Sequence, residues 1–512
     1  MTFEQIATLA ITQKLHLATQ DQLNNLKGVH LLHNALYADS LFIQDGVLFV
    51  MARTETEKRL LLISATREPG SAFTGQAGST GGASWKACPL SAENADALRH
   101  AFPWTAPRSL HDRRTTFGCG DRLGRATAGH IRALRRYQVA PVLAQQSMRE
   151  LKLTNRTYRN VIDDTSFLVF QCGYTEGFGA DGDHLKTIPD IEAALAAGMT
   201  MITLDLSEVM RPQAAAFPDA QIDSEYATLA SDVRLTVDTV YADKTVDLGS
   251  GEKLTFPRAE ARRCAVMYTT ALDFAKQVYD FLVTQKGAGH FDLEISIDET
   301  TTPTLPSHHL FFIRELIRRQ VRIVSMAPRF IGEFQKGIDY IGDIAEFRRQ
   351  FTTHCRIAKA YGDYKISVHS GSDKFSIFPI VGEVTGGRFH EKTAGTSWLE
   401  AVRLAAQEAP GLYRRMHDVA LKRLPDALKL YHITPDLTSI PDPRSLPDAA
   451  LPKLMDLNAA RQVLHVTYGF ILENQTLKAE LFALLHTAEE AHNMLLDRHF
   501  TRHLEGLGIP KK

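Results

Sequence analysis

The chain has 512 residues, enough to bury a large core without disulfide or metal staples. Its 58 basic and 59 acidic residues nearly cancel, which argues against a nucleic-acid groove or an anionic membrane surface as the main partner. We find no apolar run long enough for a membrane-spanning helix and no apolar core of a secretory signal near the N-terminus. The five cysteines are widely scattered, so we expect a cytoplasmic protein with reduced thiols.

Residues 1–110 predict a small α+β unit. Apolar segments at 41–43 and 47–52 flank Gln44-Asp45-Gly46, a hairpin signal, and 59–64 is a third candidate strand. The stretch 68–84 is rich in Gly, Ser and Thr, which predicts a mobile loop.

From residue 115 onward, short apolar strands alternate with amphipathic helices. We predict eight strands, at 115–120, 141–145, 178–184, 199–206, 291–297, 322–327, 365–369 and 388–392. These units fill residues 115–410 and predict a (β/α)8 TIM barrel, because each parallel strand needs a crossover helix. A doubly wound open sheet is the alternative, but no Gly-x-Gly-x-x-Gly follows a strand to support it.

Two long segments are additions to this barrel. Residues 208–256 interrupt the unit after the fourth strand and contain a candidate hairpin at 245–248 and 253–256. An insertion at that place lies on the catalytic face and often serves as a lid. Residues 411–512 predict a helical C-terminal extension, whose role the sequence does not indicate.

Histidines at the carboxyl ends of the strands are candidate metal ligands, because the active site of such a barrel lies there. His184, His369 and His390 belong to strands three, seven and eight, and three imidazoles with an open position suit a catalytic divalent metal such as Zn²⁺. The alternative of an ordinary packing role is strongest for His390, which could face the helices. Glu294 or Asp298 could replace a ligand, which would indicate Mn²⁺ or Mg²⁺.

Two carboxylates are candidate catalytic groups. Asp183 precedes His184, so their side chains point to opposite faces unless the strand has ended near Gly182. Glu294 shares the lumen face of its strand with other polar residues and is either an acid/base or an orienting group. For the substrate we predict contacts from the polar residues that follow the strands, with solvated surface positions as the alternative: Asp121, Gln146, Lys186, Arg329, Ser370, Asp373 and Lys392. Among these, Lys186, Arg329 and Lys392 are candidates for an anionic group.

Several of these segments resemble the tagaturonate epimerase family. The motifs are Phe117–Gly124, 144–151, 177–187 with Asp181-Gly182-Asp183-His184-Leu185-Lys186-Thr187, 293–300, 327–330, 369–375 with His369-Ser370-Gly371-Ser372-Asp373, and 392–396. The resemblance covers the barrel and departs from the family at Gly182, where we expect Ala. It implies a cytoplasmic enzyme of hexuronate catabolism that interconverts D-tagaturonate and D-fructuronate with a divalent metal cation (Zn, Mn or Ni). Relatives or engineered forms act on fructose and tagatose.

The pair Asp183-His184 with His369-Ser370-Gly371-Ser372 also looks like class II aldolases, so a metal-dependent aldolase of a ketose or keto sugar acid is the alternative function. A non-catalytic sugar-binding barrel is the third. The carbon inverted by the epimerase lies β to the ketone and is not acidified by simple enolisation. We therefore predict retro-aldol cleavage and re-addition, with Asp183 or Glu294 taking the hydroxyl proton. The expected partner is a small sugar or sugar acid, with no nucleic acid and no membrane; the sequence does not decide between a monomer and a homo-oligomer.

Overall fold

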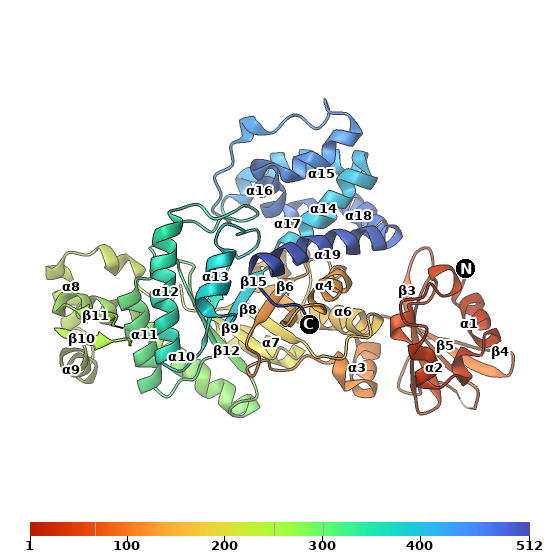
Figure 1. Cartoon of the computed structure of the whole chain (residues 1–512), viewed down its shortest axis with the longest axis horizontal. Helices are drawn as coiled ribbons and strands as arrows, with labels where there is room; N and C mark the ends of the chain where they lie inside the picture. The colour runs from red at the N-terminus through yellow and green to blue at the C-terminus, as the bar shows by residue number, and fades with distance from the viewer. Residues whose placement is uncertain (67, 250, 301) are drawn as a thin grey trace.

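The structure, a computed structural model, describes residues 1–66, 68–249, 251–300 and 302–512. Figure 1 shows a central barrel with three additions: an N-terminal unit on one flank, the insertion on the opposite flank, and a group of C-terminal helices over one end. Among the described residues, no helix is both long and apolar enough to cross a membrane.

Eight parallel strands close into the barrel in the order β12-β13-β14-β15-β6-β7-β8-β9. They are β6 Thr116–Gly120, β7 Ala140–Ser147, β8 Gly179–Leu185, β9 Met201–Asp205, β12 Asp292–Ile297, β13 Ser325–Pro328, β14 Lys365–Val368 and β15 Phe389–Thr393. Each overlaps a strand expected from the sequence, and the closed order excludes the open sheet. The predicted (β/α)8 barrel is confirmed.

Amphipathic helices surround the strands and bury their apolar faces against them. The helices are α4 Thr127–Leu134, α5 Met148–Thr154, α6 Tyr158–Gln171, α7 Ile188–Ala197, α10 Arg258–Lys286, α11 Pro306–Arg318, α12 Ile344–Ala360, α13 Phe378–Thr385 and α14 Thr396–Glu408. In α12, Asp343 caps the N-terminus, and Phe347 and Phe351 are fully buried. Burying one such ring contributes about 1.5–3 kcal/mol. The main core therefore lies between strands and helices, which leaves the lumen for polar side chains.

The N-terminal unit contains a five-stranded antiparallel sheet in the order β1-β2-β3-β5-β4. Its elements are α1 Phe3–Thr12, α2 Gln20–Asn24, β1 Phe42–Gln44, β2 Val47–Arg53, β3 Lys58–Ser64, β4 Gln76–Thr80, β5 Ala83–Pro89 and α3 Ala92–Ala101. Strand β4 corrects the expectation of a mobile loop at 68–84. Gly81 and Gly82 have φ of 56° and 81°, the backbone that a two-residue hairpin turn requires. The glycines therefore mark a tight turn between two paired strands.

The insertion forms α8 Asp219–Ala227, α9 Ser231–Val240 and a hairpin of β10 Lys244–Asp247 with β11 Lys253–Phe256. The expected hairpin is present. Ile222, Tyr226 and Phe256 are buried in the core cluster that α10 and α11 share with the barrel. The insertion thus thickens the outer wall of the barrel (Figure 1).

The C-terminal extension contains α15 Pro410–Ala427, α16 Asn458–Val466, α17 Tyr468–Glu473, α18 Gln475–Thr487 and α19 Glu489–Gly506. Helices α15 to α18 share an apolar core with α14, the last helix of the barrel. Helix α19 packs along α4 and also contacts α14, the helices that follow the neighbouring strands β6 and β15 (Figure 1).

Candidate active site

An irregularity at the end of β8 places two successive side chains in the site. The pairing of β8 with β9 shifts register between Gly182 and Leu185, and His184 adopts φ of 53°, a left-handed conformation uncommon for a residue with a side chain. Regular alternation would separate Asp183 from His184. Because the strand is distorted here, both residues line the same cavity. Left-handed backbone at non-glycine residues is often found at functional sites.

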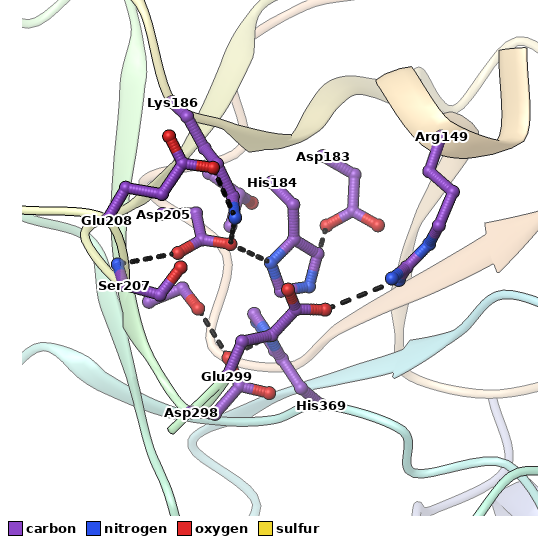
Figure 2. A network of polar contacts seen from close by, with 12 residues as sticks. Arg149, Asp183, His184, Lys186, Asp205, Ser207, Glu208, Asp298, Glu299 and His369 are labelled. Atoms are coloured by element: carbon purple, nitrogen blue, oxygen red, sulfur yellow. Dashed lines mark hydrogen bonds and ion pairs between the residues drawn. The ribbon is translucent and has the colours of Figure 1, made fainter. Parts of the chain in front are cut away.

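His184, His369 and Asp298 each bring one ligand atom within 4.8 Å of the others (Figure 2). The two imidazole rings lie edge to face with their centroids 5.0 Å apart. Asp298 Oδ1 lies 3.2 Å from His369 Nδ1 and accepts a hydrogen bond from Ser296 Oγ. Two imidazoles and one carboxylate suit divalent transition metals. From the sequence alone, Asp298 is predicted only as a possible replacement ligand.

The surroundings of His184 are strongly anionic. Its Nδ1 lies 3.2 Å from Asp205 Oδ2, and Glu299 completes a second group of converging ligand atoms. Although burial opposes the charged ring, Asp183 and Asp205, with Glu299 and Asp298 farther away, raise the pKa of His184 to about 10. The chemistry and the charge of this donor set therefore fit a divalent cation.

Lys392 Nζ lies in the lumen among three carboxylates, at 2.7 Å from Asp181, 2.5 Å from Asp183 and 3.2 Å from Glu294. Burial raises the pKa of Asp181 to about 6. At Asp183, burial is outweighed by Lys392 and two neighbouring imidazoles, which lower the pKa to about 2. Asp183 is therefore ionised at neutral pH, and Lys392 neutralises carboxylates of the protein itself.

The two predicted catalytic carboxylates differ in their access to the cavity. Glu294 is fully buried; its carboxylate accepts a hydrogen bond from Ser325 Oγ at 2.6 Å and lies 2.7 Å from His369 Nε2. Asp183 lines the cavity. Asp183 can therefore reach a bound substrate, whereas the contacts of Glu294 suit the orienting role.

His390 is not brought together with the other two histidines. It lies two residues before Lys392 on the same lumen face of β15, with Nδ1 2.9 Å from Thr116 Oγ1. Burial lowers the pKa of His390 to about 3. It belongs to none of the groups of converging ligand atoms found among the described residues. The structure thus places it deeper in the barrel than His184 and His369.

Gln145, not Gln146, lines the cavity. A register shift at 142–144 changes the alternation of β7, after which Gln146 pairs with Gly182 of β8. A Cβ at Gly182 would meet side chains of Leu185, Ala194 and Ile202. The paired positions Gly182 and Gln146 therefore face the helices. We therefore replace Gln146 by Gln145 as the candidate substrate contact. The sequence pattern could not distinguish these two residues, because it does not show the register shift.

Of the remaining predicted contacts, Ser370 and Arg329 line the site and Asp121 does not. Ser370 accepts a hydrogen bond from Lys336 at 2.6 Å. Asp121 instead accepts hydrogen bonds from the backbone N–H groups of Leu123 at 3.1 Å and Ala126 at 2.7 Å. Its carboxylate shapes the loop after β6.

Lys186 and Asp373 line neither cavity of the site, and both form ion pairs with other side chains. Lys186 Nζ lies 3.7 Å from Asp205 and 3.2 Å from Glu208 of the insertion (Figure 2). Asp373 pairs with Arg461 of the extension at 2.7 Å and lines a separate cavity of about 450 Å³.

Two adjoining cavities meet over the histidine pair, one of about 40 Å³ and one of about 200 Å³. They share the residues His184, His369, Ser370, Lys336, Arg149 and Tyr431. The Arg149 guanidinium stacks 4.7 Å from the centroid of the Tyr431 ring. Sequence reasoning missed three of these residues. Arg149 follows β7 closely and could have been found as a strand-end residue, whereas Lys336 and Tyr431 follow no strand directly.

The extension and the loop after β13 cover the mouth of the barrel. Tyr431 and His465 come from the extension and line the cavity, as does Lys336. A Cβ at Gly395 would lie 2.0 Å from His465 Nε2, so the two parts approach closely there and a side chain at this position would force the imidazole to shift. Among the described residues that line either cavity, none belongs to 208–256. The expected lid role of the insertion is therefore corrected: its apolar faces hold it on the outer wall.

Known proteins share this architecture over nearly the whole chain. A tagaturonate/fructuronate epimerase of Thermotoga maritima is 38% identical over 470 residues, which cover 92% of this chain and 96% of the relative. A glycerol-complexed crystal structure of the fructuronate-tagaturonate epimerase UxaE from Cohnella laeviribosi matches with a TM-score of 0.88 and 44% identity, covering 93% of this chain and 96% of that one. Its native crystal structure matches with a TM-score of 0.88 and 43% identity, covering 94% and 98%. A family model described as tagaturonate epimerase matches residues 37–507, so the chain belongs to the tagaturonate epimerase family and is an enzyme of the epimerase class.

Proposed function

We propose that this enzyme interconverts D-tagaturonate and D-fructuronate by breaking and re-forming a carbon–carbon bond beside a divalent cation. The observation that carries the proposal is that His184, His369 and Asp298 each bring one ligand atom within 4.8 Å of the others, next to the ionised Asp183, at the mouth of the barrel. The relatives named as tagaturonate/fructuronate epimerases support the choice of substrate.

His184, His369 and Asp298 would hold the cation, and Asp205 and Glu299 lie close enough to His184 to supply a further carboxylate. When bound, a divalent cation at this place supplies Lewis-acid polarisation of the substrate oxygens. Zn²⁺, Mn²⁺ and Ni²⁺ all accept nitrogen and carboxylate ligands, so we propose this group of ions and expect activity to select among them. Glu294 orients His369 through the 2.7 Å contact with its Nε2.

Asp183 is the proposed acid/base group. It takes the proton of the hydroxyl on the carbon β to the ketone, the bond from that carbon to the carbon next to the ketone breaks, and its electron pair passes to the ketone side as an enediolate. The other fragment is an aldehyde. After it turns its opposite face, the same bond re-forms and Asp183 returns the proton to the new alkoxide. Lys392, 2.5 Å from Asp183, keeps the carboxylate ionised before the proton is taken.

Lys336 and Arg149 are the proposed partners of the substrate carboxylate. Both line the two adjoining cavities, and Arg149 is held in place by its stacking on Tyr431. Arginine and lysine bind carboxylates by charge-assisted hydrogen bonds. We therefore propose that the enzyme prefers a uronate to the neutral ketoses fructose and tagatose, which lack the carboxylate.

Side-by-side assays test the substrate and the metal. The metal-free enzyme is supplied with Zn²⁺, Mn²⁺, Ni²⁺ or Mg²⁺ and assayed on tagaturonate and on fructose. We expect activity to depend on an added ion and kcat/KM to be higher for tagaturonate. Full activity in the metal-free protein would exclude the cation, and equal kcat/KM for both substrates would exclude the carboxylate contact.

Crossover labelling tests the bond cleavage. Two differently labelled tagaturonates are converted together, with an aldehyde-trapping reagent in parallel reactions. Trapped aldehyde, or rare exchange of fragments, supports the retro-aldol route, since the cover of the mouth limits escape. Solvent deuterium at the inverted carbon, without crossover or trapping, means direct deprotonation. Free aldehyde accumulating at equilibrium would instead favour the aldolase.

A further inference from the structure

A second group of metal-ligating side chains lies outside the lumen, where α10 packs against α11. Glu260 and Cys264 are one turn apart on α10, and His308 lies in the first turn of α11. One ligand atom from each residue lies within 4.8 Å of the others. We propose that these three residues bind a thiophilic divalent cation such as Zn²⁺, independently of the site at the barrel mouth.

The environment of His308 indicates that a ligand binds at this place. Its side chain is only 3% exposed, and neither of its ring nitrogens has a hydrogen-bond partner among the described residues. Buried imidazoles are normally hydrogen-bonded, so an unpartnered one needs an explanation. The histidines of the barrel mouth differ from it, because each of their rings forms a hydrogen bond with a carboxylate.

The contact between His308 and Glu260 has the geometry of two ligands. Nε2 lies 3.1 Å from Glu260 Oε1, well within hydrogen-bond range, yet the ring nitrogen is not aligned for a hydrogen bond with that oxygen. A close but misaligned nitrogen and oxygen can both face a point between them, as ligands of one cation do. Ser307 Oγ donates to the same oxygen at 3.0 Å and holds the carboxylate in place.

The chemistry of the three donor side chains and the partial exposure of Glu260 indicate which cation would bind. A thiolate from Cys264, an imidazole and a carboxylate are ligands that Zn²⁺ accepts, and the thiolate disfavours Mg²⁺ and Ca²⁺. The two anionic ligands balance the charge of a divalent ion. Cys264 is fully buried, whereas the Glu260 side chain is 24% exposed, so water can complete the coordination from the solvent side.

Cobalt absorption distinguishes this site from the one in the lumen. Co²⁺ bound to a thiolate gives a sulfur-to-metal charge-transfer band, and the barrel-mouth group contains only nitrogen and oxygen ligands. The metal-free full chain is titrated with Co²⁺. We expect the band in the unmodified protein, its loss in Cys264→Ser, and its retention in the matched control Cys355→Ser on α12. Excess Zn²⁺ should remove the band from the unmodified protein by displacement.

A second variant covers the case in which Cys264→Ser fails to fold. Glu260→Gln changes a partly exposed side chain, and we expect it to weaken the Co²⁺ affinity read from the band roughly tenfold, the size of effect seen when metal-site contacts are lost. No band in the unmodified protein, a band that persists in folded Cys264→Ser, or unchanged affinity in Glu260→Gln would each overturn the proposal. Epimerase activity with a saturating ion reports separately on the barrel mouth.

Discussion

The insertion at 208–256 and the helical extension at 411–512 both add apolar helices to the same barrel, but they bury different surfaces. The insertion packs Ile222 and Tyr226 into the core that α10 and α11 share with the barrel, and it stays on the outer wall. The extension packs on α14, and its Tyr431 and His465 reach the cavity at the barrel mouth. The segment nearer in sequence to a catalytic strand is therefore the one that lies farther from the site.

The difference shows that the position of an added segment depends more on where its apolar face can be buried than on where the segment joins the barrel. The insertion leaves the barrel at the end of β9, on the catalytic face, yet its helices turn outward to cover apolar surface. The extension follows the last barrel helix and returns over the mouth. Four substitutions test this comparison, beginning with a group of the cavity that the extension covers and the insertion does not reach.

Asp183→Asn should have the largest effect. The amide keeps the shape of the side chain but cannot take the hydroxyl proton, so we expect kcat on tagaturonate to fall roughly 10²–10⁴-fold. Glu208→Gln is the control at the base of the insertion, because Glu208 contacts Lys186 outside the cavity; its kcat should stay within about twofold of the unmodified enzyme. Steady-state kinetics measure both. A kcat for Asp183→Asn above roughly a tenth of the original would remove Asp183 from the mechanism.

Glu489→Gln tests how firmly the extension is joined to the N-terminal unit. The Glu489 carboxylate lies 2.5 Å from Lys58 and 3.1 Å from Arg53, and accepts a hydrogen bond from Tyr37 at 2.6 Å. Removing the charge leaves Lys58 buried without its partner, so the free energy of unfolding should fall by about 3 kcal/mol at pH 7. Chemical denaturation measures it. The neighbouring Glu490→Gln, at an exposed pair, should cost less than about 1 kcal/mol.

The lowered pKa of the Glu489 carboxyl predicts that the free energy of unfolding depends on pH. Burial opposes its charge, but Lys58, Tyr37 and Arg53 lower the pKa of Glu489 to about 2, from an ordinary value of 4.5. Burial also lowers the pKa of Lys58, which offsets part of the gain. A lowered carboxyl pKa stabilises the fold above pH 4.5, and this stabilisation is lost as the pH falls towards 2. The unfolding free energies of the original protein and Glu489→Gln should therefore converge over that range; parallel curves would contradict the assignment.

Tyr431→Ala removes the ring on which Arg149 stacks. Cation–π contacts contribute about 0.5–2 kcal/mol, so we expect kcat/KM for tagaturonate to fall by roughly tenfold, mainly through KM. Tyr431→Phe keeps the ring and loses only the hydroxyl contact with Tyr468 at 3.2 Å; it should remain within about threefold. If both variants behave alike, the ring is not what positions Arg149.

Glu252→Gln in the insertion should have the smallest effect. Glu252 pairs with Arg356 and accepts a hydrogen bond from Thr353 at 2.5 Å, both on α12. Because Arg356 is 42% exposed, we expect a loss of less than about 1 kcal/mol in unfolding free energy and no change in kcat/KM beyond about twofold. Chemical denaturation and steady-state kinetics on the same preparation measure these two quantities. A tenfold loss of kcat/KM with unchanged stability would mean that the insertion acts on the site.

The barrel could be predicted because each of its units carries its own local pattern. Every strand is a short apolar segment followed by an amphipathic helix, and no distant contact is needed to recognise either. For the same reason, the sequence could indicate that His184, His369, Asp183 and Lys392 lie together, as the cavity lining shows: each stands at a strand end, and parallel strands in a barrel bring those ends together.

The remaining parts of the site depend on contacts that no local pattern records. The register shift at 142–144 turns Gln145 inward and Gln146 outward, and the one after Gly182 admits Asp183 and His184 to one cavity. Lys336 and His465 come from a long loop and from the extension, so only tertiary packing brings them to the mouth. For His390 the strand pattern left open whether the side chain faces the lumen or the helices, and it did not indicate how deep in the barrel the residue lies.

The contact between Gly395 and His465 makes one position a control on the width of the entrance. An ordinary Cβ contact begins at 3.4 Å, whereas a Cβ here would lie 2.0 Å from the imidazole. Any larger residue would therefore force the His465 side chain, or the helix α16 that carries it, to shift. A graded series at Gly395 (Ala, Ser, Val) would displace the imidazole in steps while Asp183 on β8 stays as it is, so the width of the entrance could be varied separately from the proposed acid/base group.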